Sequence, residues 1–478
     1  MYLNDLSDLE DVFVDIVPEN NDNLHFLTYS EETEYVNTCL QLMYDYINEN
    51  PCAVSEPDFE EILIDNIKEL YELQFANSKL LMNDEDEEDL DEVTEVALSL
   101  FYTQLFPKRS YPNTFIMKSL SKLEHGIITK KIEYLRGKPQ PEQRTPAWYI
   151  FRHNLITASN AYKAFENETT RNQLIFEKCQ PLKIEEAISE KPAYVNISSP
   201  FHWGQKYEPV SVMFYENKYK TTVGDFGCIQ HDKYPFLGAS PDGINVNPKD
   251  PRFGRLLEIK NIVNREIDGI PKKEYWVQMQ LQMETCDLDE CDFLECRFSE
   301  YENESAFYAD GTFYATRDND VKGVILYFSN KDGNPKYVYM PFHITDKPEF
   351  DKWEQEMMNL HSESLTWIKN IYWRLDEYSC VLVLRNTKWF QDTVGELADT
   401  WKIIEKERNS GFQHRAAAKR NKKTVDMKVD DVPSGCFLSI RKLDGKITVR
   451  NSATNISPTI IKVRTESFDE AKKIDVKT

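Results

Sequence analysis

The chain has 478 residues, a formal net charge of −24, and 41% hydrophobic and 12% aromatic residues. It can bury a large core, in two or three domains or in one domain with appendages. No apolar run approaches the roughly 20 residues of a membrane-spanning helix, and the acidic N-terminus lacks the features of a signal peptide. Nine cysteines without zinc-type spacing are typical of reduced thiols. We therefore expect an intracellular protein that is neither secreted nor bound to a membrane.

The negative charge is concentrated at one end of the chain. Residues 1–100 hold 28 Asp and Glu but only two Lys, whereas the remaining 378 residues hold 53 acidic and 55 basic side chains. Most of the chain is therefore nearly neutral and could present a basic groove to DNA. The densest acidic run, residues 83–92, is expected to be a solvated loop. The alternatives are a mimic of the DNA backbone and a docking site for a basic partner.

The N-terminal part of the chain predicts helices. Within residues 1–105, "EYVNTCLQLMYDYINEN" and "DFEEILIDNIKELYELQF" place apolar residues at three- and four-residue intervals. Helices are also expected at 146–154, at 158–167 and in "SPFHWGQKYEPVSVMFYENKY". The sequence therefore begins with an acidic helical region and continues into a mainly helical stretch.

Strand patterns follow in the middle of the chain. They occur in "TTVGDFGCIQ", "GINVN", "RLLEIKNIV" and "DFLECRFSE", with a helix at 272–284 before the last. "GVILYFSN" and "KYVYMPFHI" predict a hairpin, and helices are expected over 348–378 and 387–408. This order favours an α/β fold in which helices flank a mixed central sheet.

Three domains follow from this organisation. Residues 1–105 form the acidic helical region, and residues 106–408 form the α/β domain, which carries the motifs described below. Residues 409–478 combine a basic linker, "HRAAAKRNKK" at 414–423, with a small β-rich module. The linker could bind DNA without sequence preference or act only as a tether.

Two short stretches place acidic residues beside a lysine. "LGASPDG" holds Asp242 between a proline and a glycine, and "LLEIK" holds Glu258 and Lys260 on one face of a strand, with Ile259 on the other. If "GINVN" pairs with "RLLEIK", Asp242 can approach Glu258. Two carboxylates and the Ile259 backbone carbonyl are ligands suited to Mg²⁺, with Lys260 beside a metal-bound water. The alternative is chance, because short D…ExK patterns recur in long sequences.

A second candidate site lies upstream, in "AWYIFRHNLITAS". Thr157 is expected to cap a new helix, so Ser159 would lie near a helix N-terminus with Arg152 close by. A hydroxyl, an arginine and a helix N-terminus together can bind a phosphate. The alternative is a solvated Arg152 and a Ser159 that serves only the cap.

Further polar residues flank the metal-site motif. Glu208 in "WGQKYEP" could reach the outer sphere of a metal or a second ion. In "YWVQMQLQME", Tyr275 and Gln278 lie one helical turn apart, whereas Gln280 points elsewhere. Gln278 could hydrogen-bond the attacking water or a phosphate. The alternatives are a surface glutamate and an amphipathic helix packed on the sheet.

The motifs "W…R…ITAS", "WGQKYE", "SPDG", "EIK" and "Y..Q.Q" resemble, in order and approximate spacing, the YqaJ-like viral recombinase family. This family includes lambda exonuclease and the alkaline exonucleases of large DNA viruses, and it belongs to the PD-(D/E)xK nucleases. The leading segment "PQPEQRTPAWYIFRHNLITASNAYKAF" resembles the large-DNA-virus branch in particular. The resemblance covers about residues 139–300, with core motifs within 144–300, and implies a restriction-endonuclease-like core there.

The resemblance implies a role for each motif residue. Asp242, Glu258 and the Ile259 carbonyl would bind Mg²⁺, for which Mn²⁺ could substitute, with Lys260 beside the nucleophilic water. The further residues that match family positions are Glu208 and Asp232 near the metal, Arg152, Ser159 and Ser240 at a 5′-terminal phosphate, and Tyr275 and Gln278 on the supporting helix.

The resulting hypothesis is a Mg²⁺-dependent deoxyribonuclease that acts 5′ to 3′ on linear double-stranded DNA with 5′-phosphorylated ends. It would serve recombination, repair or viral genome processing and leave a 3′ strand for a single-strand annealing protein. We expect it in the cytoplasm, the nucleus or a viral replication site of an infected cell, and an oligomer is compatible with the resemblance. The alternatives are an endonuclease with the same core and a DNA-end-binding scaffold with a vestigial site.

Overall fold

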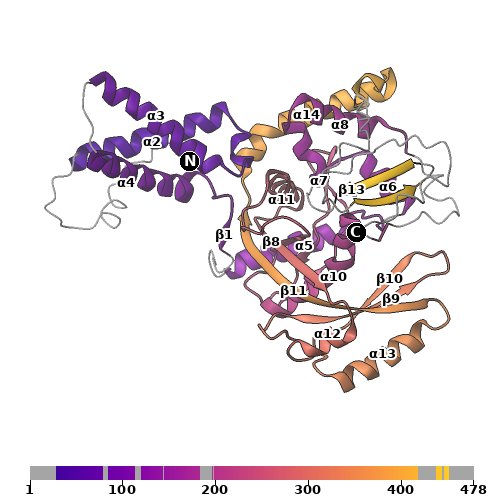
Figure 1. The fold of residues 1–478 in the computed structure, drawn as a ribbon. Helices are drawn as coiled ribbons and strands as arrows, with labels where there is room; N and C mark the ends of the chain where they lie inside the picture. The colour runs from indigo at the N-terminus through magenta and orange to yellow at the C-terminus, as the bar shows by residue number, and fades with distance from the viewer. Residues whose placement is uncertain are drawn as a thin grey trace, which may run out of the picture. The chain divides into compact units, whose positions relative to one another are not determined.

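A computed structural model describes residues 28–78, 84–112, 120–143, 145–182, 196–197, 199–417, 438–443 and 446–451. The chain divides into two compact units, Met1–Ala416 and Ala417–Thr478. The first unit contains both the N-terminal helices and the main sheet (Figure 1). In the described part of the chain, no helix is long and apolar enough to cross a membrane.

The first unit is built around an eight-stranded sheet with the order β10-β9-β11-β8-β7-β6-β3, in which β1 pairs with β11. The pair β7–β8 is parallel and the other pairs are antiparallel. The strands are β1 (Tyr111–Pro112), β3 (Val223–Gly224), β6 (Gly243–Asn245), β7 (Leu256–Asn261), β8 (Glu290–Glu300), β9 (Lys322–Ser329), β10 (Pro335–Tyr339) and β11 (Thr366–Leu384). This mixed sheet confirms the predicted α/β architecture.

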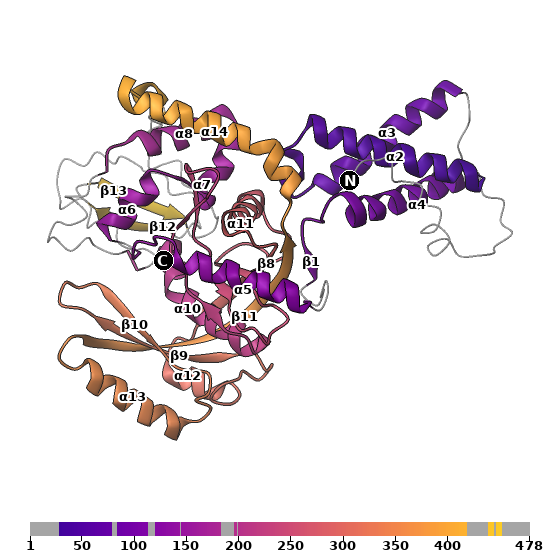
Figure 2. The same cartoon turned by 180° about the vertical axis from the view of Figure 1, so that it is seen from behind.

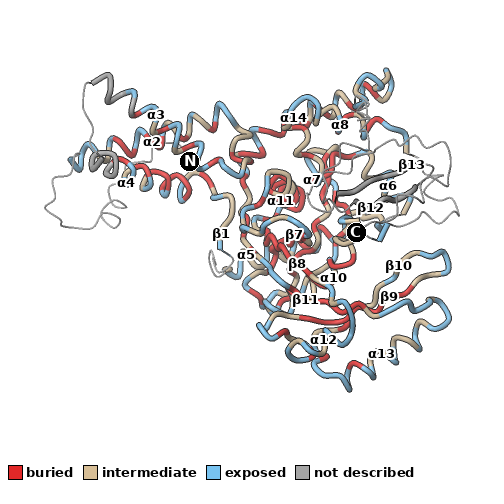
Figure 3. The backbone as a smooth tube through the Cα atoms, in the orientation of Figure 1, coloured by how far each residue is buried: buried red, intermediate tan, exposed pale blue. Residues whose placement is uncertain are grey.

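Helices α10 and α11 cover opposite faces of the sheet at β7. Neighbouring strand residues point to opposite faces, and Leu256 packs with the α11 residues whereas Leu257 packs with the α10 residues. Glu258 and Lys260 follow Leu256 by two and four residues, so they lie on the same face as Leu256, which is the face that α11 covers. Figure 3 shows that α11 and the strands beneath it are mostly buried.

The remaining helices and strands surround this sheet. A small sheet of β2 (Ile156–Thr157), β5 (Leu237–Ala239) and β4 (Ile229–Gln230) lies in the segment before the catalytic motifs. The helices are α5 (Lys122–Gly137), α6 (Pro146–His153), α7 (Ala158–Ala161), α8 (Glu168–Cys179), α10 (Pro200–Tyr219), α11 (Lys273–Cys286), α12 (Glu304–Ala309), α13 (Lys347–His361) and α14 (Thr387–Ser410).

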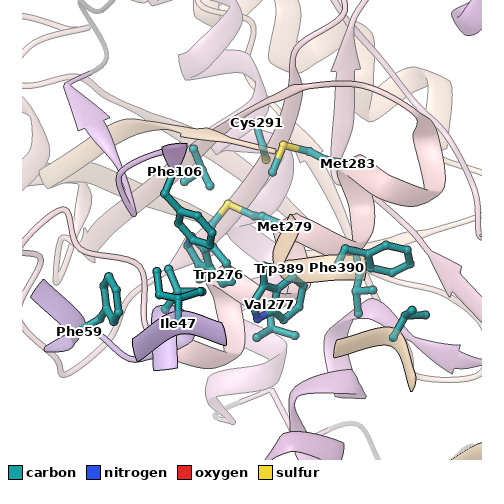
Figure 4. Packing of buried hydrophobic residues seen from close by; sticks show 14 of the residues in the cluster. Ile47, Phe59, Phe106, Trp276, Val277, Met279, Met283, Cys291, Trp389 and Phe390 are labelled. Atoms are coloured by element: carbon teal, nitrogen blue, oxygen red, sulfur yellow. The ribbon is translucent and has the colours of Figure 1, made fainter. Parts of the chain in front are cut away.

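The acidic N-terminal region is helical, as predicted, with α2 (Tyr29–Glu49), α3 (Phe59–Ser78) and α4 (Asp84–Leu100). The expected loop at 83–92 is wrong from Asp84 onward, because α4 begins there. Acidic residues in the first turn of a helix are favoured by its dipole, and Leu90 and Ala97 supply a buried side. Side chains of the N-terminal helices and of α11 belong to one hydrophobic cluster (Figure 4).

The expected helix over 348–378 is only half correct. Helix α13 ends at His361, and residues from Thr366 onward form β11, which pairs with β8 and β9. The segment "TWIKNIYWRLDEYSCVLVL" is rich in β-branched and aromatic residues, and its first half pairs with β9 whereas its second half pairs with β8. The predicted hairpin of β9 and β10 and the helix at 387–408 are confirmed. Figures 1 and 2 show α13 alongside β9.

The second unit contains a hairpin of β12 (Leu438–Leu443) and β13 (Lys446–Asn451). These two strands agree with the expected β-rich module. Within the basic stretch 414–423, residues 418–423 lie outside the described part of the chain.

Candidate active site

The pairing of β6 with β7 brings Asp242 opposite Glu258. Gly243 pairs with Leu257 and Ile244 with Leu256, as predicted from the sequence. The backbone N–H of Asp242 donates to the Leu257 carbonyl at 3.1 Å, and the Ile259 N–H donates to Asp242 Oδ2 at 2.7 Å. A Cβ at position 243 would lie 2.1 Å from a Val223 side-chain carbon, so this close approach requires the glycine of the SPDG turn.

Glu258 is the buried centre of the cluster. It is fully buried and accepts a hydrogen bond from Lys260 Nζ on Oε1. Its other oxygen, Oε2, accepts from Gln282 Nε2 at 2.6 Å. The Lys260 ammonium also lies 4.9 Å from the centre of the Tyr275 ring, which favours a cation over its face. Both carboxylate oxygens of Glu258 are therefore held in place by protein donors.

Gln282 was not predicted from the sequence. It also donates to the Ser240 carbonyl at 3.2 Å, so it connects Glu258 with the SPDG turn. The available signal was its spacing, because Gln282 follows Gln278 by one helical turn on the face that carries Tyr275. The predicted residue, Gln278, is half-buried on the same face. Gln280 bonds to Leu384 and Asn386, so it does not share the task of Gln278, as expected.

The cluster carries more negative than positive charge. Burial, and then the neighbouring Glu258, raise the pKa of Asp242 well above its ordinary value, although Lys260 and the Ile259 N–H oppose this. Glu208, exposed on α10, adds to the increase in the pKa of Asp242. Although burial opposes its charge, Glu258 and Asp242 raise the pKa of Lys260. One ammonium among these carboxylates leaves a local excess of negative charge, which a cation would relieve.

The donor set fits Mg²⁺ with few protein ligands. Among the described residues, no three His, Cys, Asp and Glu side chains gather closely enough to hold a metal ion. Asp242, Glu258 and the Ile259 carbonyl would supply hard oxygen donors, and Mg²⁺ usually keeps several waters. The Oε1 atom of Gln282 is buried without a hydrogen-bond partner beside this cluster, so a polar acceptor is still available there.

Asp232 lies apart from this cluster. Its side chain is 63% exposed and pairs with Lys138 at 2.8 Å, and it accepts a hydrogen bond from the Tyr134 hydroxyl at 3.0 Å. Tyr134 belongs to α5, and Lys138 is the residue that follows its end. The structure thus associates Asp232 with a surface helix and does not bring it to Asp242.

A second group of polar residues gathers around Arg152. Its Nη1 donates to Ser240 Oγ at 3.3 Å, and its guanidinium lies 4.6 Å from the centre of the Trp148 ring. Lys178, which was not predicted, donates from Nζ to the Arg152 carbonyl at 2.8 Å. Burial, and then the charges of Arg152 and Arg408, lower the pKa of Lys178 to about 8. This buried excess of positive charge favours an anion.

Ser159 is the second residue of α7, which follows β2 directly. Strands β2 and β5 are parallel with Thr157 opposite Gly238, and Ser159 and Ser240 each lie two residues further on. Ser159 is exposed, and its hydroxyl lies 3.4 Å from Thr157 Oγ1. Helix α7 begins after Thr157, as predicted, but the Thr157 side chain makes no capping hydrogen bond to α7.

Comparison with known proteins agrees with this arrangement. Residues 147–289 match the model of the YqaJ-like viral recombinase domain. An uncharacterized protein of Acanthamoeba polyphaga mimivirus is 28% identical over 394 residues, covering 75% of this chain and 68% of the relative.

Two solved structures are also similar to the chain. LHK-Exo, an alkaline exonuclease from Laribacter hongkongensis, is 17% identical over 56% of this chain and 100% of its own, with a TM-score of 0.31. LHK-Exo in complex with dAMP has a TM-score of 0.32, and 97% of that chain is covered at the same identity. The stretch that matches the YqaJ-like viral recombinase domain model, residues 147–289, is the one that carries the motifs and the residues described above.

Proposed function

We propose that the chain is a divalent-metal-dependent DNA nuclease, a phosphodiester hydrolase, and more specifically a Mg²⁺-dependent 5′-to-3′ exonuclease on linear double-stranded DNA. The observation that carries this proposal is the closeness of Asp242, the residue before β6, to Glu258 on β7, with Lys260 bonded to Glu258, inside the matched domain. The exonuclease relatives add support from outside the chain.

In this proposal, Asp242 and Glu258 hold the metal together with the Ile259 carbonyl. A bound Mg²⁺ would polarise the phosphate and lower the pKa of a water. Hydrolysis forms a bond between the water oxygen and phosphorus and breaks a phosphorus–oxygen ester bond, and the leaving oxygen gains a proton. Lys260 places an ammonium beside this centre, where it stabilises the extra negative charge of the transition state. Gln282 fixes the orientation of Glu258 from behind.

The group around Arg152 would bind a 5′-terminal phosphate. Arg152 and Lys178 supply positive charge, and Ser240 and Ser159 supply hydroxyl donors. Gln282 bonds both to Glu258 and to the Ser240 carbonyl, so the phosphate group and the carboxylates share a support. This link favours an enzyme that binds the 5′ end of the DNA and cleaves next to it. Digestion of the duplex would leave a 3′ strand for an annealing protein.

An endonuclease with the same core is the second candidate, because the carboxylate cluster alone does not require an end. One assay separates the two. Linear duplexes with and without a 5′-phosphate and covalently closed circles are incubated with the protein in Mg²⁺ or in EDTA. We expect progressive loss of the 5′-phosphorylated strand, intact circles and no reaction in EDTA.

Two variants test the site in the same assay. Asp242→Asn should be inactive, whereas Asp318→Asn, an exposed aspartate in the loop before β9, should match the parent protein. Cleavage of closed circles would contradict the exonuclease assignment. Full activity of Asp242→Asn would contradict the site itself.

A further inference from the structure

A cleft of 440 Å³ lies where the first turns of α10 face the hairpin of β9 and β10. Its volume is within the range of about 300–1,000 Å³ that is typical of ligand sites. The residues that line it from these two elements are His202, Gln205 and Lys206 on α10, and Pro335, Lys336, Tyr337 and Tyr339 on β10.

The floor of this cleft is aromatic. Tyr337 on β10 lies opposite Tyr327 on β9, which lies opposite Lys369 on β11, so the three side chains form a row on one face of the sheet. The rings of Tyr327 and Tyr337 are 5.3 Å apart. Phe328, the neighbour of Tyr327, packs with Phe350 of α13 on the other face. The row therefore faces α10, and Tyr337 is half-buried with part of its surface open.

The cleft is basic. Lys336 on its rim and Lys369 at the end of the aromatic row are both exposed, and Lys206 lines its wall. Of the nine side chains that line it in the described part of the chain, none is acidic, although Glu300 pairs with Lys206 from outside the lining. In a chain with a net charge of −24, this is a local reversal of sign that suits phosphates.

The helix that walls the cleft is attached to the catalytic strand. Asn261, the residue after Lys260, donates from Nδ2 to the Gly204 carbonyl of α10 at 3.0 Å. The Tyr339 hydroxyl donates to the Lys206 carbonyl at 2.9 Å. Glu208, two residues further along α10, is close enough for its charge to act on both Asp242 and Tyr339. The cleft is therefore linked, through α10, to the strand that carries Glu258 and Lys260.

We propose that this cleft binds single-stranded DNA, with a base stacked on Tyr337 and a phosphate paired with Lys369, which shares the face of the aromatic row. Aromatic rings beside a basic groove are the usual means of binding single strands without sequence preference. Duplex DNA fits this chemistry poorly because its bases are already stacked on each other. The inference rests on the proposed function, since removal of one strand by the nuclease exposes the other as a single strand beside the active site.

The test measures binding of a fluorescent oligothymidylate, about 12 nucleotides long, to the full chain by anisotropy in EDTA. Tyr337→Ala should weaken binding about 5- to 100-fold, because stacking on one ring is lost, whereas Tyr337→Phe should stay within about twofold. Lys369→Ala should make the dependence of log K on log salt shallower by about 0.7. Lys352→Ala, an exposed lysine on α13 across the sheet, is the matched control and should change neither quantity.

Several outcomes would overturn the inference. They are unchanged binding by Tyr337→Ala and Lys369→Ala, equal affinity for a duplex of the same length, and displacement of the oligonucleotide by dTMP at similar concentration, which would indicate a mononucleotide site. Because binding is measured in EDTA, it does not depend on nuclease activity. A failed nuclease assay would therefore contradict the proposed function but not the binding of single-stranded DNA to the cleft. Tyr337→Phe separates loss of the ring from loss of the hydroxyl that bonds His202.

Discussion

Replacement of Asp242 by Asn should make the metal-free protein more stable while it removes activity. The side chain keeps its size, and the Asn oxygen can still accept the hydrogen bond from the Ile259 N–H. Only the charge is lost. Burial and the neighbouring Glu258 raise the pKa of Asp242, which means that its charge costs free energy in the folded state.

The size of the effect follows from the register. Residues that lie directly opposite on antiparallel strands have Cβ atoms about 4.5–5.5 Å apart. Two negative charges about 5 Å apart, at an effective dielectric constant of about 20, repel by about 3 kcal/mol. The ammonium of Lys260 offsets part of this repulsion. We therefore expect Asp242→Asn to gain about 1–3 kcal/mol in free energy of unfolding without metal, which amounts to roughly 2–4 °C in Tm per kcal/mol.

The pH dependence has a defined sign. Because the pKa of Asp242 is raised in the folded state, the cost of its charge is present at high pH. The cost disappears as the pH falls below about 4, where the carboxyl is protonated in both the folded and the unfolded state. The advantage of Asp242→Asn should therefore be greatest at pH 8 and should shrink toward pH 4.

The measurement is thermal unfolding of both proteins in EDTA at several pH values and again in Mg²⁺. Mg²⁺ should raise the Tm of the parent protein more than that of Asp242→Asn, because a ligand stabilises only the state that binds it. Asp318→Asn is the control for loss of one exposed carboxylate and should change stability by less than about 0.5 kcal/mol. A lower Tm for Asp242→Asn in EDTA at pH 8 would refute the electrostatic reasoning.

Three further predictions concern the residues around these carboxylates. Gln282→Leu should lower kcat about 10- to 100-fold, because Glu258 loses a hydrogen-bond donor. Gln278→Leu should lower kcat less. Equal losses of rate for the two variants in single-turnover assays would contradict the special role of Gln282. Lys260→Ala should reduce hydrolysis by at least about 100-fold at saturating metal, and a residual rate near that of the parent would contradict its role. Lys178→Met should weaken the preference for 5′-phosphorylated ends, measured as a ratio of kcat/KM values. In the parent protein this ratio should fall as the pH rises through about 8, where the ammonium is lost, and a ratio independent of pH would contradict the assignment.

The carboxylate pair could be predicted because its geometry is local. Only a short connection separates β6 from β7, so the pairing of these two strands determines which residue lies near Glu258. Gly243 allows the turn before β6 to pass close to Val223 of β3. Alternation along a strand then places Lys260 on the same face. The general architecture was predictable for a similar reason, because the spacing of apolar residues within each segment indicates a helix or a strand.

The rest of the site depends on contacts between distant segments. Lys178 acts through a backbone carbonyl of Arg152, and its positive surroundings include Arg408, 230 residues away. No local pattern distinguishes such a lysine from an exposed one. Likewise, the strands that pair with β11, namely β1, β8 and β9, come from distant parts of the chain, so its place in the sheet could not be predicted from its own segment.

The acidic N-terminal helices contribute to the position of the catalytic helix. Arg109 donates to the carbonyls of Val54 and Pro271, and Lys273, the first residue of α11, pairs with Glu56 at 2.5 Å. Helix α11 carries Tyr275 and Gln282 further along, so a shift of its first turn would move the groups that contact Lys260 and Glu258. One acidic residue of this region, Glu56, therefore contacts the first residue of α11, the helix that carries Gln282.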